Sequence, residues 1–314
     1  MSAKRNTTLL ISLAFLVMLS SLLFILTGRR SEPAVDPDYF RTVASENIDR
    51  VLLKRQGKEV ELSFTNNRWR VNNTWDADNQ MIKVLFATLR QAEPRRPVAA
   101  ALRDSVCARL ERDGVLVTVF TQGQEQMRFF AGGNTLKTET WFWKGGQSEP
   151  YQMVIPGYRV FVAGILELDE SGWRNKRIFD FNWRNFKSFS AYYNSDPAQN
   201  FQLEFDRDRV VMRQEDAADT AKLNEYLDAV SLLFARRFID AQDPHADSVV
   251  KTGPLAKLEI RDIADRAYVL ELFRPSPRSQ EVIGRLGDGQ RVALDKADVA
   301  ELVRKRDYFK QAGH

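Results

Sequence analysis

Cysteine and histidine are scarce in this chain of 314 residues, which has one cysteine, Cys107, and two histidines, His245 and His314. A lone cysteine cannot form an internal disulfide, so it says little about the redox compartment. Two histidines exclude a zinc site built from several histidines, and no His-x-x-x-His motif occurs. We expect no metal site, and because the sequence also lacks a catalytic motif and a glycine-rich loop that could hold a phosphate, we expect no cofactor and no catalytic residues.

Most of the chain also lacks a surplus of either charge. The formal net charge is +4, and four cations near the N-terminus account for all of it: Lys4, Arg5, Arg29 and Arg30. Without them, residues 31–314 hold 42 basic and 42 acidic residues. Binding to nucleic acid generally needs a basic folded domain. The neutral body of this chain therefore predicts no nucleic-acid partner.

One long hydrophobic run is present near the N-terminus. Between Arg5 and Arg29 lie 23 uncharged residues, and residues 8–27 are apolar apart from small hydroxyl side chains. About 20 helical residues span roughly 30 Å, the thickness of the hydrocarbon layer. We therefore predict a single transmembrane helix that anchors the chain in a lipid bilayer through residues 8–27. The alternative, a cleaved signal peptide, normally has a shorter apolar region and a small-residue cleavage site.

The flanks of this run indicate an orientation. Long domains are translocated largely regardless of their charge, so the short basic tail is the informative side. We predict that residues 1–30 are the tail and anchor in the bacterial inner membrane, with the large domain on the extracytoplasmic side. Residues 31–46 begin as a polar, proline-containing segment, which predicts a stalk.

Hydrophobic alternation and turn signals predict the first half of the folded part. Three strands begin near Ile48, with a tight turn at Asn66-Asn67. A helix follows, because Asp76 or Asp78 can cap it and apolar residues then recur at helical spacing. Four more strands and a short helix over residues 156–168 complete this half.

The second half repeats the same order of elements, which predicts an α+β fold with two tandem, similar, β-rich modules. Each module is expected to be an antiparallel sheet with a packed helix, including a last helix over residues 296–306. We assign residues 47–172 to the first module, 173–185 to the connection and 186–314 to the second module.

Two segments carry a resemblance to a known family. They are the strand Arg68-Trp69-Arg70-Val71, which leads to Ala77-Asp78, and the junction segment Trp173-Arg174-Asn175-Lys176-Arg177-Ile178-Phe179. With the tandem order, they make residues 45–310 resemble the uncharacterised bacterial family called domain of unknown function 4340. The resemblance implies a membrane-anchored, extracytoplasmic accessory subunit of an ABC-type transport system of the gliding-motility kind, with integral-membrane partners. It supplies no catalytic residues.

Two further segments contain side chains capable of chemistry. Residues 242–248 combine Asp, His245 and Ser, which could indicate a Ser/His/Asp constellation or a cation-binding loop. Triad members converge in space whereas sequence neighbours usually point apart, and the spaced oxygen ligands of an EF-hand are missing. We therefore predict a solvated loop. Cys107 lacks the local signature of a nucleophile and is expected to be a small buried side chain or an ordinary thiol.

An aromatic run offers a possible interaction surface. Trp141 and Trp143 would share one face of a strand while Phe142 takes the other, and Tyr151 lies nearby in the sequence. Outward indoles would form a platform for a glycan or a peptide, but we favour packing in the core.

The junction segment interleaves cations and aromatic residues. Arg174 and Arg177 complete the possible interaction surface, although acidic residues lie beside them and a solvated connection is the interpretation that we favour.

Three functions stay open at this point. The first is an accessory or interaction protein without enzymatic activity, the second an envelope hydrolase with paired carboxylates, and the third a glycan- or peptide-binding module. The repeated architecture and the missing catalytic signatures favour the first.

Overall fold

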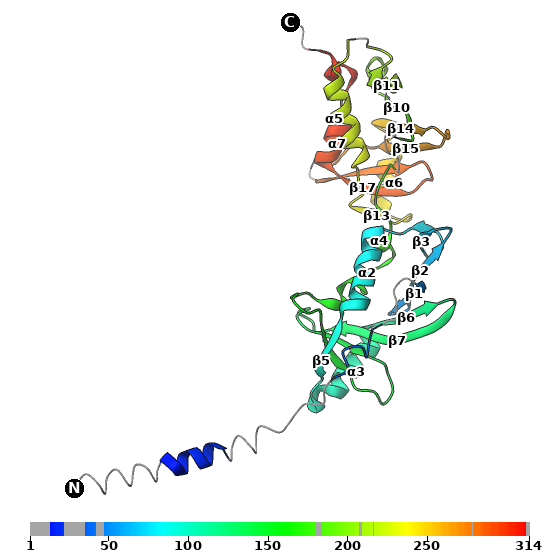
Figure 1. The fold of residues 1–314 in the computed structure, drawn as a ribbon. Helices are drawn as coiled ribbons and strands as arrows, with labels where there is room; N and C mark the ends of the chain where they lie inside the picture. Colours follow the sequence, from blue (N-terminus) through cyan, green and yellow to red (C-terminus); the bar gives the residue numbers. More distant parts are fainter. Residues whose placement is uncertain are drawn as a thin grey trace, which may run out of the picture. The chain divides into compact units, whose positions relative to one another are not determined.

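The chain folds into two compact units, Met1–Trp173 and Arg174–His314. The computed structural model describes residues 13–21, 35–41, 47–179, 184–206, 209–215, 217–277 and 279–311. Figure 1 draws the sheet of the first unit in blue to green and that of the second in green to red.

The first unit is built on an antiparallel nine-stranded sheet with the order β4-β3-β2-β1-β6-β7-β8-β9-β5. Its strands are β1 (Ile48–Arg55), β2 (Lys58–Thr65), β3 (Arg68–Val71), β4 (Trp75–Asp76), β5 (Glu93–Pro97), β6 (Val115–Thr121), β7 (Gln124–Gly133), β8 (Thr140–Trp143) and β9 (Tyr151–Val154). Its helices are α2 (Asn79–Gln91), α3 (Ala100–Asp113), the 3-10 helix η2 (Val162–Ile165) and α4 (Glu170–Trp173).

The second unit is built on an antiparallel eight-stranded sheet with the order β12-β11-β10-β14-β15-β16-β17-β13. Its strands are β10 (Phe186–Tyr193), β11 (Phe201–Asp206), β12 (Arg209–Met212), β13 (Arg237–Ile239), β14 (Ala256–Asp262), β15 (Ala267–Leu272), β16 (Glu281–Leu286) and β17 (Arg291–Asp295). Its helices are η3 (Pro197–Gln199), α5 (Thr220–Ser231), α6 (Pro244–Val250), α7 (Lys296–Leu302) and η4 (Arg306–Phe309).

The two sheets share one topology. Apart from β4, the strand order of the first sheet matches that of the second position by position, from β3 with β12 to β5 with β13. An irregularity in register also recurs, between Ile48 and Arg50 where β1 pairs with β6, and between Phe186 and Ser188 where β10 pairs with β14. The structure therefore contains two similar antiparallel modules in tandem.

The core of each unit lies between one face of its sheet and an amphipathic helix. In the first unit, α2 buries Ile82, Leu85 and Leu89 in one cluster with strand residues that include Val51 and Leu62. In the second unit, α5 occupies the equivalent place, and its buried residues are Leu223, Tyr226, Leu227 and Val230. Burial of such apolar stripes is what holds a helix on a sheet.

Both core helices begin at an aspartate. The Asp78 carboxylate accepts hydrogen bonds from the backbone N–H groups of Gln80 and Met81, and that of Asp219 does the same for Ala221 and Lys222. A side-chain acceptor at this position satisfies N–H groups that have no partner within the helix. Asp78, and not Asp76, is therefore the cap of α2.

A second helix lies on the opposite face of each sheet, and the sequence predicted neither. Helix α3 follows β5 and packs Val106 and Leu110 against Trp143. Helix α6 follows β13, and its buried residue is Ala246. Neither helix has the broad apolar stripe that identifies an amphipathic helix in a sequence.

Two helix predictions are wrong in extent. Pro156-Gly157 forms a turn, in which the Tyr158 N–H donates to the Ile155 carbonyl and Gly157 has a φ of +81°. Proline followed by a residue with positive φ is typical of such a turn, so only the 3-10 helix η2 is left of the helix predicted over residues 156–168. Helix α7 ends at Leu302, short of residue 306.

The predicted membrane anchor is corrected by the structure. Residues 13–21 form a helix of nine residues. At about 1.5 Å per residue it extends over roughly 14 Å, about half of the hydrocarbon layer. Within the described part of the chain, no helix is both long and apolar enough to cross a membrane. The remaining parts of the predicted span, residues 8–12 and 22–27, lie outside the described residues.

Part of the predicted stalk packs on the first unit. Phe40 is only 1% exposed and belongs to the core cluster of that unit. Its ring lies 5.7 Å from that of Phe129 and 5.6 Å from that of Phe142. Edge-to-face contacts of this kind stabilise a core beyond the apolar area they bury. Residues 31–34 and 42–46 of the predicted stalk lie outside the described residues.

Candidate functional site: a polar hollow beneath helix α6

Trp141 and Trp143 lie between β8 and helix α3. Trp143 is 5% exposed, stacks on Phe130 with 5.5 Å between ring centroids, and donates from Nε1 to the Ser148 carbonyl at 2.9 Å. Trp141 is half-buried and packs against the same cluster beneath α3. Core packing, the interpretation favoured from the sequence, therefore holds, and the two indoles form no open platform for a glycan or a peptide.

Tyr151 belongs to the other face of the first sheet. Its ring lies 5.3 Å from that of Tyr39 and 6.0 Å from that of Phe40, and it packs against the main core. Burial raises the pKa of its hydroxyl, with Glu149 adding to the effect. Trp141, Trp143 and Tyr151 therefore do not meet on one surface.

Arg174 and Arg177 lie in the second unit. Arg174 is 8% exposed, its guanidinium stacks 3.5 Å from the centroid of the Phe238 ring, and it hydrogen-bonds to Gln290. Arg177 is exposed, 5.7 Å from the centroid of the Phe234 ring. A planar guanidinium packs well on an aromatic face, so Arg174 serves the fold of this unit. The solvated connection predicted for this segment is therefore wrong at Arg174, as it is at the buried Ile178 and Phe179.

Cys107 lies on α3 and packs against the apolar cluster beneath that helix. Burial raises the pKa of its thiol, and the nearby carboxylates of Asp104 and Glu111 raise it further. A raised pKa lowers the fraction of thiolate, the reactive form. The surroundings of Cys107 are therefore those of a structural thiol.

His245 lies on helix α6, so the solvated loop predicted over residues 242–248 is wrong. Asp243 caps this helix by accepting from the N–H groups of His245 and Ala246 at 2.9 and 3.1 Å. A cap and a proline at the first helical position are the local signals that start α6. Because the segment lacks an apolar stripe, the cap and the proline alone do not identify a helix in the sequence.

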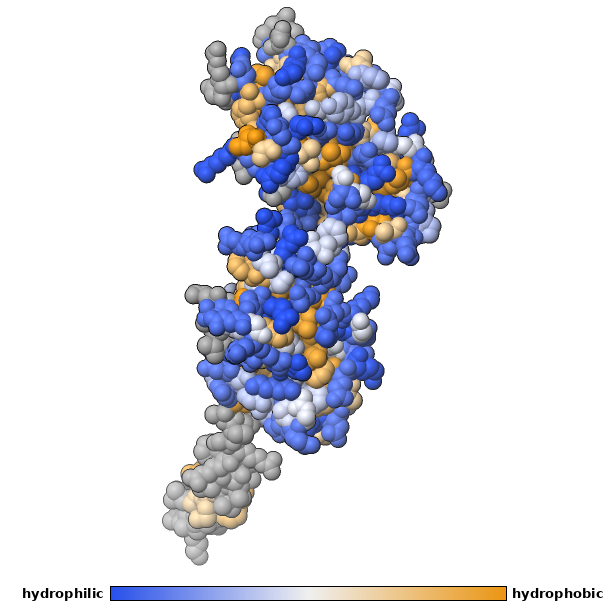
Figure 2. Space-filling view, turned by 90° about the vertical axis from the view of Figure 1, so that its right-hand side faces the viewer, coloured by the Kyte–Doolittle hydropathy of each residue, from blue (hydrophilic) through white to orange (hydrophobic). Residues whose placement is uncertain are grey.

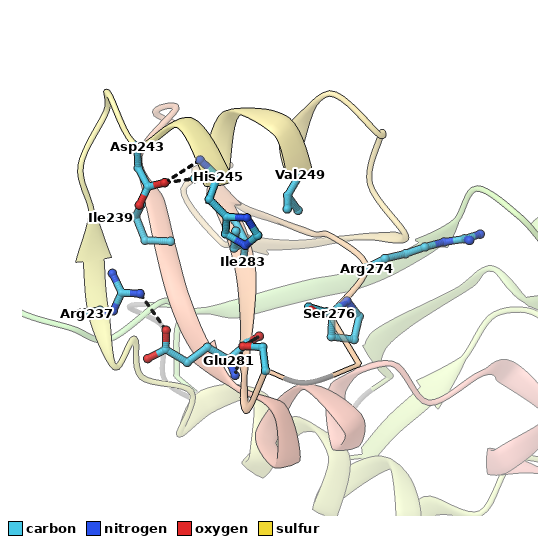
Figure 3. A pocket seen from close by; sticks show the side chains of 12 residues that line it. Arg237, Ile239, Asp243, His245, Val249, Arg274, Ser276, Glu281 and Ile283 are labelled. Atoms are coloured by element: carbon cyan, nitrogen blue, oxygen red, sulfur yellow. Dashed lines mark hydrogen bonds and ion pairs between the residues drawn. The ribbon is translucent and has the colours of Figure 1, made fainter.

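Helix α6 borders a hollow of about 230 Å³ in the second unit. Figure 3 shows His245 and Val249 on the helix, Ile283 and Glu281 on β16, and Arg237 paired with Glu281. The hollow is lined by Arg237, Ile239, Asp243, His245, Ala246, Val249, Arg274, Pro275, Ser276, Ser279, Glu281 and Ile283. These residues come from three separate segments, and no local motif in the sequence joins them.

The two carboxylates of this hollow are already engaged. Glu281 accepts from Arg237 at 2.8 Å. Hydrogen bonds from the N–H groups of Ala246 and then His245 hold the pKa of Asp243 below its usual range, although partial burial opposes them. A general acid needs a raised pKa near the operating pH, and the pKa of Asp243 is shifted in the opposite direction.

A second hollow of about 620 Å³ adjoins the first. Its lining residues are Asn194, Ser195, Val249, Thr252, Gly253, Pro254, Leu255 and Arg274. Val249 and Arg274 line both hollows. In Figure 3, the Arg274 side chain extends away from the other labelled side chains. We call the two hollows together the α6 groove.

A third hollow, of about 210 Å³, lies in the first unit and contains Arg55, Arg109 and Lys137. All three cations have partners within it. Arg55 donates to the Asp113 carbonyl at 3.0 Å, Arg109 to the Thr135 hydroxyl at 3.1 Å, and Lys137 pairs with Glu167 at 2.8 Å. The α6 groove is therefore the better candidate for a binding site.

The described residues include no group of three His, Cys, Asp or Glu side chains placed to hold a metal ion. On the face drawn in Figure 2, the described surface of both units is largely hydrophilic, and apolar residues gather in limited patches.

The fold thus defines a class of protein, a tandem of two antiparallel modules with a polar groove on the second. The family model described as "Domain of unknown function (DUF4340)" matches residues 69–251, more than half of the chain. The chain belongs to this family, as its resemblance predicts. The match runs from β3 of the first unit to α6 of the second. No curated protein matches the chain.

Proposed function

We propose that this chain is a non-enzymatic accessory protein of an ABC-type transport system, and that it works by binding a partner protein at the α6 groove. The transport system and its integral-membrane components as partners are taken from what the family resemblance implies. An extracytoplasmic position of the two units is part of the proposal.

The observation that carries a binding role is the difference between the two modules at equivalent places. In the first module, Trp143, Trp141 and Phe130 fill the space beneath α3. In the second module, the cluster beneath α6 consists of Ile239, Ala246 and Ala293 with Ile283 beside it, and a hollow remains. Two alanines and two isoleucines under a short helix fill less space than the indoles beneath α3, and they leave room that a ligand can occupy.

The hydrogen bonds of the two carboxylates in the groove, Asp243 and Glu281, favour a role in binding over a role in catalysis. Asp243 is committed to capping α6 and Glu281 to Arg237. Neither is paired with the other in the arrangement that acid–base hydrolysis requires. Their ordered positions instead provide fixed hydrogen-bonding groups at the wall of the groove.

In-cell crosslinking tests the proposal. The full chain, tagged at its C-terminus, is crosslinked in the cells that naturally make it, and the products are identified by mass spectrometry. We expect integral-membrane components of an ABC-type transporter. Recovery of soluble cytoplasmic proteins alone would contradict both the partner and the location. Protease treatment of intact cells after removal of any outer barrier reports the location independently, because extracytoplasmic units would be cleaved.

A further inference from the structure

We infer that the α6 groove binds an extended peptide segment that bears a carboxylate, which Arg274 receives. The inference rests on the proposed function, because it names the chemistry of the partner at the same groove. The support comes from the shape of the groove, its charges and the side chains that line it.

The shape of the groove suits an elongated ligand. Two hollows of about 230 and 620 Å³ adjoin each other at Val249 and Arg274. A ligand that occupies both hollows can therefore contact Val249 and Arg274 where the hollows adjoin. An extended peptide advances by about 3.3 to 3.6 Å per residue, so a few residues can occupy both hollows in sequence.

The arginines around the groove differ in whether they have an acidic partner. Arg237 pairs with Glu281 at 2.8 Å, and Arg291 pairs with Asp247 on α6 at 2.5 Å. On the neighbouring strands, Arg285 pairs with Glu271 at 2.5 Å. Arg274 has no ion pair with any residue that the structure describes, although it lines both hollows. A guanidinium in this position can form a bidentate pair with an incoming carboxylate.

The first hollow adds polar groups next to the segment that carries Arg274, although the Arg274 side chain itself extends away from them (Figure 3). The imidazole of His245 and the hydroxyl of Ser276 face the hollow, and neither forms a side-chain hydrogen bond within the described part of the chain. These side chains can donate to a carboxylate or to peptide carbonyls. The Arg237–Glu281 pair forms another part of the wall and can accept from a peptide N–H.

The second hollow offers a mixed lining that suits a peptide backbone. Asn194 uses its Nδ2 to donate to the Pro254 carbonyl at 2.9 Å, which fixes the amide and leaves its oxygen as an acceptor. Pro254 and Leu255 supply small apolar contacts beside it. Alternating polar and apolar contacts are how extended peptides are recognised.

Other ligand classes fit the groove less well. Among the described residues that line the two hollows there is no Phe, Tyr or Trp, and His245 supplies the one aromatic ring. Proteins that bind single-stranded nucleic acid or free bases generally stack them on aromatic rings. Of the two described arginines that line the hollows, Arg237 is already paired with Glu281, so Arg274 alone offers an unpaired guanidinium there, whereas a polyanion requires a cluster of cations. A peptide with a single carboxylate is therefore the ligand that these residues favour.

Peptide selection with the full chain tests the inference. One synthetic library contains seven-residue peptides blocked at both ends with Glu fixed in the centre, and a matched library has Gln there. A third library has no acidic side chain but a free C-terminal carboxylate. We expect enrichment from the first or the third library and none from the Gln library. The first and third libraries distinguish a side-chain carboxylate from a terminal one.

Two charge-reversal variants test the role of the arginine. Arg274→Glu is expected to weaken binding of the selected peptide by about tenfold or more, because it replaces attraction by repulsion. Arg209→Glu is the matched control, since Arg209 is exposed on β12, the edge strand opposite β13. It should leave the affinity within about twofold of the original, and both variants should unfold like the parent chain because surface substitutions have small effects.

Several outcomes would overturn the inference. They are a failure of all three libraries, equal enrichment of Glu and Gln peptides, or equal loss of binding in both variants. Its failure can be separated from failure of the proposed function. If Arg274→Glu leaves the crosslinked transporter components unchanged, the role of Arg274 in the groove is wrong, and the accessory function stands without it. If crosslinking returns no transporter component but peptide binding depends on Arg274, the reverse holds.

Discussion

The backbone N–H of Asp219 donates a hydrogen bond of 2.8 Å to the carbonyl oxygen of Phe309. In the first unit, the N–H of Asp78 donates to the carbonyl oxygen of Trp173 at the same distance. Each aspartate caps the core helix of its unit, and each acceptor is a fully buried aromatic residue close to the end of that unit. In each of the two modules, one backbone hydrogen bond therefore joins the start of the core helix to the end of the module.

Removal of a cap should loosen this junction. We expect Asp219→Ala to destabilise the second unit by about 1 kcal/mol, because two N–H groups of α5 lose their acceptor. Hydrogen exchange of the full chain, resolved by peptide, should show faster exchange in α5. Asp219→Asn is the matched control, since asparagine caps nearly as well. Unchanged exchange in Asp219→Ala would contradict the role of this cap.

The repeated order of elements could be predicted because its signals are local. The turn at Asn66-Asn67, with φ values of 52° and 64°, is confirmed. The three strands predicted from Ile48 onward are present as β1, β2 and β3, since alternation on a half-buried sheet leaves a clear pattern. The position of β5 and β13 beside β9 and β17 could not be predicted, because pairing between distant strands leaves no local mark.

The candidate site could not be predicted for a related reason. The sequence singles out His245, but Arg237, Arg274 and Glu281 lie on other segments and resemble ordinary surface residues in the sequence. Arg237, His245 and Glu281 line one hollow because β13, α6 and β16 meet at one side of the sheet, and Arg274 reaches its edge from the segment between β15 and β16. Trp141 and Trp143 form an aromatic run that suggests a possible interaction surface. Their burial depends on α3, which has two buried residues and no apolar stripe and is therefore hard to predict from the sequence.

The packing beneath α3 can be tested with Cys107 as a reporter. Trp143→Ala should destabilise the first unit by about 3 to 5 kcal/mol, because it leaves a cavity under the helix and removes the hydrogen bond to Ser148. Cys107 is the sole cysteine and lies on this helix. Its reaction with a thiol reagent should therefore become at least about tenfold faster as α3 opens more often.

A matched control for this experiment lies on the same helix. Leu102 is 57% exposed on α3, so Leu102→Ala should change the stability by no more than about 0.5 kcal/mol and leave the thiol reaction rate almost unchanged. Equal rates in Trp143→Ala and the parent chain would show that α3 does not depend on this indole.

A buried hydroxyl connects α5 to α7. The Tyr226 hydroxyl donates to the Leu302 carbonyl at 2.8 Å, and burial raises its pKa well above the ordinary value. Tyr226→Phe should cost about 1 to 3 kcal/mol, because the buried carbonyl at the end of α7 loses its donor. Urea denaturation of the full chain measures the loss of stability. Hydrogen exchange of the α7 amides shows whether this loss is felt in α7. The centroid of the Phe309 ring lies 5.2 Å from that of the Tyr226 ring. Phenylalanine at position 226 keeps this ring contact, so the variant reports the loss of the hydroxyl alone.

The last prediction concerns acid stability and the Asp262 carboxylate, whose side chain is fully buried. Burial acts to raise its pKa, but hydrogen bonds from the Arg266 N–H, the Arg266 guanidinium at 2.6 Å and the Ala264 N–H together lower it. A carboxyl whose pKa is lower in the folded state contributes stability above its unfolded pKa of about 4 and loses that contribution as the pH falls through the folded pKa.

Asp262→Asn should therefore be less stable than the parent chain at pH 7, and the difference should shrink as the pH falls below about 4. Urea denaturation at a series of pH values measures the free energy of unfolding of the parent chain and of the variant as a function of pH. The two curves converge at low pH if the ionised carboxylate carries the effect, because a protonated Asp262 no longer holds Arg266 by charge. A difference that stays constant from pH 7 down to pH 2 would instead assign the effect to the shape of the side chain.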